Sequence, residues 1–136
     1  MIALRRQAVP LARNPEALAE HFGVGAAAAR LFAEAGANLM LVARNRKNLE
    51  AIAAELRDKS RVEIFPMDVA DADSCVDLFK KTQFEFGRMD VLVNNAGIFF
   101  PGSVFDEPDG NLEKMIDTNL YSAYYLSRAL IGLMLP

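Results

Sequence analysis

The chain has 136 residues, of which 52% are hydrophobic and 24% are charged, so it is large and apolar enough to fold as one domain. Its net charge of −3 excludes the strongly basic surface by which proteins bind nucleic acid or an acidic membrane, and no apolar run is long enough to span a bilayer. The single cysteine, Cys75, excludes an internal disulfide and is interpreted as a small apolar filler. We therefore expect a cytoplasmic protein.

The predicted helices follow from apolar residues at helical spacing. The first comes after Gly23-Val24-Gly25 and ends at Gly36, with a buried face of Ala28, Leu31, Phe32 and Ala35. The second has a buried face of Leu49, Ile52, Ala53 and Leu56. The third runs from a cap at Asp71 or Asp73 to Phe86, with Val76 and Phe79 inward and Gly87 as its stop. The last starts near Asn111 and shares a face among Leu112, Ile116, Leu120, Ala123 and Tyr124.

Three short apolar runs between these helices predict strands at residues 39–42, 62–65 and 91–93. Continuous apolar runs of this kind are typical of strands that are buried on both faces. Strands that alternate with helices indicate βαβ units with right-handed crossovers. The expected fold class is a doubly wound α/β fold with a parallel sheet, in which ligands bind at the carboxyl ends of the strands.

Candidate cofactor-binding residues stand at or near such ends. Gly23 and Gly25 would allow a backbone to approach a phosphate at a helix N-terminus, although a flexible turn explains the pair equally well. Arg44 lies 19 residues after Gly25, where dinucleotide folds read the adenine ribose. A guanidinium suits a 2′-phosphate, so NADP (NADPH) is favoured over NAD, and a solvated basic turn is the alternative.

Two further motifs follow strands. Asp68-Val69 comes after the strand at 62–65, where the carboxylate could accept a hydrogen bond from an adenine amino group or could form a turn or cap. The run Asn94-Asn95-Ala96-Gly97 follows the strand at 91–93. Its amides could tie neighbouring strands together, and the small Ala96-Gly97 pair would let a flat ring lie close to the backbone.

These motifs together resemble the short-chain dehydrogenase/reductases. The resemblance rests on the block Leu31–Asn45, on Asp68-Val69, on the run from Asp90 to Gly97 and on Asp117-Thr118-Asn119. Members of that family reduce carbonyls or oxidise alcohols with NAD(P)(H) on a Rossmann fold.

The resemblance also implies roles for the matching residues. Asp68 and Val69 would flank the adenine, and Arg44 would hold the 2′-phosphate. Asn95, Ala96 and Gly97 would line the cofactor near the nicotinamide ribose. Asn119 would be the helix asparagine of the catalytic set, which organises a proton-relay water. No metal ligand is expected.

The amino end departs from the family pattern, in which a strand leads into a Thr-Gly-x-x-x-Gly-x-Gly loop. With Gly23 and Gly25 as the last two glycines, Leu18 stands at the threonine and Ala19 at the first glycine. Residues 14–18 read poorly as a buried strand, and Ile2-Ala3-Leu4 is too short and distant to be expected in its place. We expect an atypical segment at residues 1–22 and a partial, incomplete Rossmann domain at 23–136. Unless some part of residues 1–22 fills the centre of the sheet, the strands at 39 and 62 lose contact with the strand at 91.

The catalytic serine and the Tyr-x-x-x-Lys pair of the family would lie beyond the point where this chain ends, and no Tyr-x-x-x-Lys occurs in it. The expected function is an NAD(P)-dependent oxidoreductase that acts on a small-molecule carbonyl or alcohol, inactive as this polypeptide alone. A non-catalytic nucleotide-binding or protein-interaction module, or an incomplete product without a function of its own, are the alternatives. Self-association into a homo-oligomer through the last helix is also expected.

Overall fold

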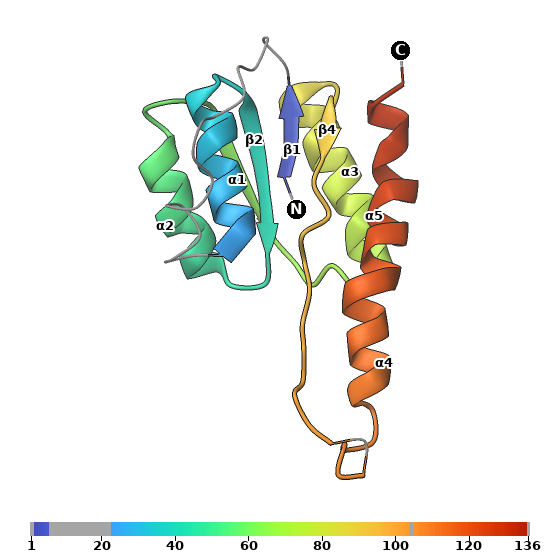
Figure 1. The fold of residues 1–136 in the computed structure, drawn as a ribbon. Helices are drawn as coiled ribbons and strands as arrows, with labels where there is room; N and C mark the ends of the chain where they lie inside the picture. Colours follow the sequence, from blue (N-terminus) through green and yellow to red (C-terminus); the bar gives the residue numbers. More distant parts are fainter. Residues whose placement is uncertain (1, 6–22, 104, 136) are drawn as a thin grey trace.

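The structure, a computed structural model, describes residues 2–5, 23–103 and 105–135. Helices α1 (Gly23–Glu34) and α2 (Arg46–Leu56) cover one face of a four-stranded sheet, and α3 (Ala72–Phe86) and α5 (Ser122–Leu130) cover the other (Figure 1). The strands are β1 (Ile2–Arg5), β2 (Asn38–Ala43), β3 (Val62–Pro66) and β4 (Val91–Leu92). This three-layer arrangement confirms the predicted α/β fold class. Within the part of the chain that the structure describes, no helix is long and apolar enough to cross a membrane.

The sheet order is β3-β2-β1-β4, and β1 is antiparallel to both of its neighbours, whereas β2 and β3 are parallel. The expectation that Ile2-Ala3-Leu4 could not fill the centre of the sheet is therefore wrong. An open position between two strands offers backbone donors and acceptors to a segment of either direction, and antiparallel pairing is at least as stable as parallel pairing. Leu18, Ala19 and the rest of residues 6–22 lie outside the described residues.

The reversed direction of β1 changes the way the chain enters the fold. Ile2 pairs with Leu41 near the carboxyl end of β2, and Arg5 pairs with Asn38 at the opposite end. Strand β1 therefore ends beside the amino ends of the parallel strands, on the side of the sheet opposite to their carboxyl ends. In a Rossmann unit the first strand instead leads directly into the first helix.

The inner strand β2 separates two hydrophobic clusters. Leu39 and Leu41 pack with α1 and α2, and Met40 and Val42 pack with α3 and α5. All four side chains are buried, as predicted for a strand that is covered on both faces. Strand β4 is shorter than expected and stops before Val93; it pairs with β1 at two positions, Ala3 with Leu92 and Leu4 with Val91.

The predicted buried face of α2 is confirmed, but that of α1 is displaced. The buried residues of α1 are Ala27, Ala29 and Ala33, whereas the predicted Leu31 and Phe32 are half-buried at its sides. Alanines against the sheet let the helix axis approach closely, and the larger apolar side chains fit only along the flanks. The glycines also belong to the first turn of α1 and do not precede it.

Helix α3 begins and ends where the sequence predicts. The carboxylate of Asp71 accepts a hydrogen bond from the Asp73 backbone N–H, and Gly87 ends the helix with a positive φ of 73°. Val76 was expected to face inward but is 51% exposed. The buried face instead consists of Cys75, Leu78 and Thr82, with Phe79 partly buried beside it. Helical spacing of three and four residues that starts at Cys75 instead of Val76 gives this face correctly.

The last helix starts at Asn111 as predicted but is not α-helical throughout. It comprises α4 (Asn111–Ile116), a π-helical turn (Asp117–Tyr121), α5 and a 3₁₀ turn (Ile131–Leu133). The face on which Leu112, Leu120 and Tyr124 were placed is exposed. The side of α5 that packs on α3 carries Ser122, Leu126 and Leu130 instead.

Candidate functional site

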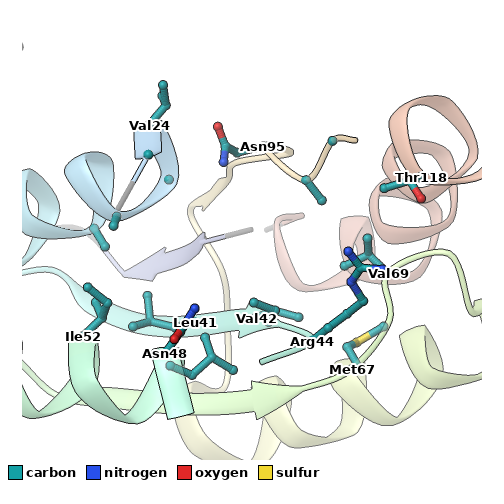
Figure 2. A pocket seen from close by; sticks show the side chains of 18 of the residues that line it. Val24, Leu41, Val42, Arg44, Asn48, Ile52, Met67, Val69, Asn95 and Thr118 are labelled. Carbon is teal, nitrogen blue, oxygen red and sulfur yellow. The ribbon is translucent and has the colours of Figure 1, made fainter. Parts of the chain in front are cut away.

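A cavity of about 350 Å³ lies at the carboxyl ends of β2 and β3, beside the first turn of α1 and the segment that follows β4. Figure 2 shows Val24 and Asn95 on one side of it, Arg44 at the end of β2 and Thr118 on a helix at the far side. All eight positions that the sequence suggested for cofactor binding line this cavity: Gly23, Gly25, Arg44, Asp68, Val69, Asn95, Ala96 and Gly97. The parallel strands bring them together because their carboxyl ends share one edge of the sheet.

The first turn of α1 forms the part of the cavity that is best suited to a phosphate. Gly23 has a φ of 75°, a left-handed conformation that favours glycine. A Cβ on Gly25 would lie 2.7 Å from Nδ2 of Asn95, so any side chain at this position would force the Asn95 amide to move. The turn Gly23-Val24-Gly25-Ala26 carries no acidic side chain, and its backbone N–H groups, which have no acceptor within the helix, favour an anion together with the helix dipole.

The basic turn after β2 contributes one of its charges to the cavity. Arg44 lines it, whereas Arg46 points its guanidinium to Glu50, with Nη1 3.6 Å from Oε1. No acidic residue among those described forms an ion pair with Arg44, so its charge is available to an anion. Asn45 caps α2 by accepting a hydrogen bond from the Asn48 backbone N–H at 3.1 Å, and Asn48 also lines the cavity.

Asp68 forms a turn, which is one of the two interpretations that the sequence left open. Its Oδ1 accepts a hydrogen bond from the Ala70 backbone N–H at 3.0 Å, which forms a local turn after β3. Asp68 is nevertheless exposed at the cavity, so its second oxygen remains accessible to a ligand. Val69 is buried beside it and gives this end of the cavity an apolar wall.

Within the part of the chain that the structure describes, a side-chain hydrogen bond joins the Asn94–Gly97 run to the last helix, and none joins it to a neighbouring strand. Nδ2 of Asn94 donates to Oγ of Ser127 on α5 at 3.2 Å, so the expectation that this amide ties strands together is wrong. Asn95 faces the first turn of α1, and Ala96 and Gly97 line the cavity with small side chains. The run thus fixes one wall of the cavity and leaves room beside the backbone.

The predicted catalytic residue Asn119 lies next to the cavity without lining it. It belongs to the π-helical turn, and its side chain both accepts a hydrogen bond from the backbone of Ile98 and donates one to it. Ile98 N–H donates to Oδ1 at 2.7 Å, and Nδ2 donates to the Ile98 carbonyl at 2.9 Å. Asn119 therefore holds the segment that leaves the cavity, and the neighbouring Thr118 is the residue that lines it.

Sequence reasoning missed several lining residues, among them Thr118, Ile98 and Asn48. Thr118 stands inside the Asp117-Thr118-Asn119 motif, so its proximity to Asn119 was the available signal. Asn48 stands one helical turn after Asn45, and its inclusion follows once α2 is known to start at the rim of the cavity. Ile98 directly continues the Asn94–Gly97 run and carries no signal of its own.

Behind the cavity, a bidentate ion pair joins α1 to α2. Arg30 Nε donates to Glu55 Oε1 at 2.7 Å and Arg30 Nη2 donates to Oε2 at 2.9 Å. These hydrogen bonds lower the pKa of the Glu55 carboxyl below its ordinary value. The pair therefore links α1 to α2.

Other reactive groups lie away from the cavity. Cys75 is buried in the cluster under α3, and this burial raises the pKa of its thiol, as expected for a structural cysteine. Among residues 2–5, 23–103 and 105–135, no group of three or more histidine, cysteine or acidic side chains could hold a metal ion.

Comparisons with known proteins agree with this geometry. A family model described as enoyl-(acyl carrier protein) reductase matches residues 18–136. An uncharacterised oxidoreductase of Staphylococcus aureus strain USA300 is 33% identical over 113 residues, which are 83% of this chain and 48% of that protein. The chain thus spans about half the length of the curated relatives it matches.

Solved structures give the same result. L-Sorbose reductase from Gluconobacter frateurii, solved with NADPH and L-sorbose, is 30% identical with a TM-score of 0.73 over 78% of this chain and 41% of that one. A metagenomic short-chain oxidoreductase solved with NADP is 32% identical with a TM-score of 0.75 over 81% of this chain and 51% of that one. With the family model matching most of the chain, this protein belongs to the short-chain dehydrogenase/reductase family.

Proposed function

We propose that the chain forms the dinucleotide-binding part of an NAD(P)-dependent oxidoreductase that interconverts a small-molecule carbonyl and an alcohol by hydride transfer. The observation that carries this proposal is the gathering of all eight candidate binding positions at one cavity. The relatives solved with NADPH or NADP support it, because their matching part has the same fold. In this proposal residues 23–136 form a partial Rossmann domain, and its four-stranded sheet also includes β1 from the atypical segment 1–22.

Each part of the cavity suits a part of a dinucleotide. The first turn of α1 would receive the pyrophosphate. Asp68 and Val69 would contact the adenine, and Ala96 and Gly97 would lie near the nicotinamide ribose. The reduced nicotinamide supplies the hydride when it is bound. Within this chain, Asn119 acts as a positioning residue, because its side chain fixes the backbone of Ile98 at the end of the cavity.

We further propose that this polypeptide binds the dinucleotide without turnover. The family transfers the proton from a tyrosine that is activated by a lysine four residues on, and this sequence contains no Tyr-x-x-x-Lys. Steady oxidation of NADPH by a carbonyl compound, catalysed by the purified chain and lost in Asn119→Ala, would overturn this proposal.

The preference for NADP over NAD rests on Arg44. It lines the cavity, and no described acidic residue neutralises it, so a 2′-phosphate gains a charge-assisted hydrogen bond that a 2′-hydroxyl cannot match. We expect calorimetric titration to show NADPH binding at least about tenfold tighter than NADH. Arg44→Leu should remove this preference and leave NADH affinity unchanged.

Arg46→Leu is the matched control, because Arg46 belongs to the same basic turn but pairs with Glu50 and does not line the cavity. It should keep the preference for NADPH. Equal affinities of the unchanged chain for NADPH and NADH would refute the role of Arg44. No measurable affinity for either dinucleotide would refute the proposed function itself.

A protein-interaction role is the second candidate, and the exposed apolar face of the last helix favours it. Leu120 is 61% exposed, and Leu112 and Tyr124 continue the same face. Burial of such a face against a second copy would remove apolar surface from water. We expect light scattering at high concentration to detect a homo-oligomer that Leu120→Glu dissociates. A monomer at all concentrations would contradict this role.

A further inference from the structure

A second cavity of about 280 Å³ lies in the segment between β4 and α4, which extends away from the three layers (Figure 1). Phe99 and Phe100 line one part of it, Asp106 and Glu107 another, and Met115 of α4 a third. The proposed binding of a dinucleotide uses none of these residues. Its volume is at the low end for ligand sites, so it would hold a small molecule or a single group of a larger one.

Residues that are close in the chain line the two cavities. Ile98 and Thr118 line the first cavity, and Phe99 and Met115 line the second. Phe99 follows Ile98 in the chain, and Met115 lies about one helical turn before Thr118. The two hydrogen bonds between Asn119 and Ile98 fix the junction. A molecule that reacts at this end of the first cavity could therefore extend a substituent into the second.

The lining of the second cavity is suited to a positive charge. Neither Asp106 nor Glu107 forms an ion pair with any residue that the structure describes. Phe99 is 77% exposed, and the face of an aromatic ring attracts a cation. Residues 99–117 carry one base, Lys114, against five acids: Asp106, Glu107, Asp109, Glu113 and Asp117. These acidic surroundings contrast with the basic turn at Arg44, which lines the first cavity.

We propose that the second cavity binds a small organic cation, either a quaternary ammonium group or a protonated amine. Asp106 and Glu107, which form no ion pair with a described residue, provide the charge attraction, and Phe99, Phe100 and Met115 provide an apolar contact that an inorganic cation would not use. If the proposed function also holds, the substrate is a carbonyl or alcohol with a cationic substituent. That second step rests on the proposed function, whereas binding of the cation does not.

The test is a titration of the isotope-labelled chain with choline chloride, followed by backbone amide chemical shifts. The matched probe is neohexyl alcohol, in which carbon replaces the ammonium nitrogen of choline. We expect choline to shift the amides of Phe99, Phe100 and Asp106, and the uncharged isostere to bind at least about tenfold more weakly. Equal affinities of the two probes, or no shifts with choline, would overturn the proposal.

Two variants test whether Asp106 and Glu107 provide the negative charge that attracts the cation. The double variant Asp106→Asn with Glu107→Gln should weaken choline binding at least about tenfold. Glu113→Gln should leave it unchanged, because Glu113 is a nearby exposed acid that does not line the cavity. Unchanged choline binding in the double variant would overturn the proposal.

A parallel NADPH titration separates this proposal from the proposed function. The double variant should keep the NADPH affinity of the unchanged chain, which also shows that it is folded. Absence of choline shifts at Phe99, Phe100 and Asp106 in the unchanged chain, with NADPH binding intact, would remove only the cation site. Choline binding without NADPH binding would leave the cation site in place and refute the dinucleotide site.

Discussion

Replacing Gly25 by alanine should damage ligand binding with little effect on stability. The added Cβ would lie 2.7 Å from Nδ2 of Asn95, and ordinary contact begins at 3.4 Å, so the amide must withdraw by about 0.7 Å. Since the clash involves the end of a side chain, Asn95 can change rotamer at a cost of about 0.5–1.5 kcal/mol. Alanine is favoured over glycine in a helix by about 0.5–1 kcal/mol, which offsets most of that cost.

The free energy of unfolding should therefore change by less than about 1 kcal/mol. Both residues line the proposed phosphate end of the cavity, so a displaced Asn95 and an added methyl group act directly on the ligand. We expect the NADPH affinity to fall at least about tenfold, which corresponds to about 1.4 kcal/mol. Differential scanning calorimetry measures the stability, and isothermal titration measures the affinity.

Gly36→Ala is the matched control with the opposite pattern. Gly36 has a φ of 75°, a Cβ at this position would meet no atom within 4 Å, and the residue does not line the cavity. The left-handed conformation should destabilise the alanine variant by about 1–2 kcal/mol, with unchanged NADPH affinity. An unchanged NADPH affinity in Gly25→Ala, or a loss of affinity in Gly36→Ala, would refute the assignment of the first turn of α1.

Three further results are expected. Leu78→Ala should lower the free energy of unfolding by about 2–5 kcal/mol and Val76→Ala by less than about 0.5 kcal/mol; equal losses in urea unfolding would contradict the orientation of α3. Glu55→Gln should lower the free energy of unfolding by about 0.5–1 kcal/mol at neutral pH. Because the pKa of Glu55 is lowered in the folded state, this difference in stability is fully present above the ordinary glutamate pKa of about 4.3. It is lost as the pH falls through the folded-state pKa of Glu55. A difference in stability that persists in acid would contradict the role of the ion pair. Asn119→Ala should speed hydrogen exchange of the Ile98 amide at least about tenfold, and unchanged exchange would show that the hydrogen bond does not form.

Local sequence patterns were sufficient for the position of most elements. Strand β2 and helix α2 follow directly from apolar spacing, because each packs its largest side chains against the core. The same rule misplaced the buried faces of α1 and α3. In α1 the residues that touch the sheet are alanines, and Phe32 lies at the side. A hydrophobicity pattern gives weight to large side chains, whereas close helix-to-sheet packing selects small ones.

The centre of the sheet could not be predicted from its own residues. The four residues Ile2–Arg5 are too few to establish a period, and nothing in them encodes a strand direction. Their place depends on backbone groups that β2 and β4 leave free, which is a non-local property. The sequence did show that the sheet would be broken unless some part of residues 1–22 occupied this position.

The candidate site was accessible to sequence reasoning because parallel strands end at one edge of a sheet. Residues as distant as Gly23 and Gly97 therefore meet without any local signal that links them. The contact between Asn119 and Ile98 was not accessible in this way. It spans 21 residues and depends on a π-helical turn, which ordinary helical spacing does not predict.

The most direct test of the dinucleotide site is to map where NADPH binds by following backbone amide chemical shifts of the isotope-labelled chain. The account predicts saturable shifts that concentrate at Gly25, Arg44 and Asn95–Gly97, with the exposed face of α3 unaffected. Saturable shifts that avoid these amides, or no shifts at NADPH concentrations far above the micromolar range, would contradict the assignment of this cavity to a nicotinamide dinucleotide.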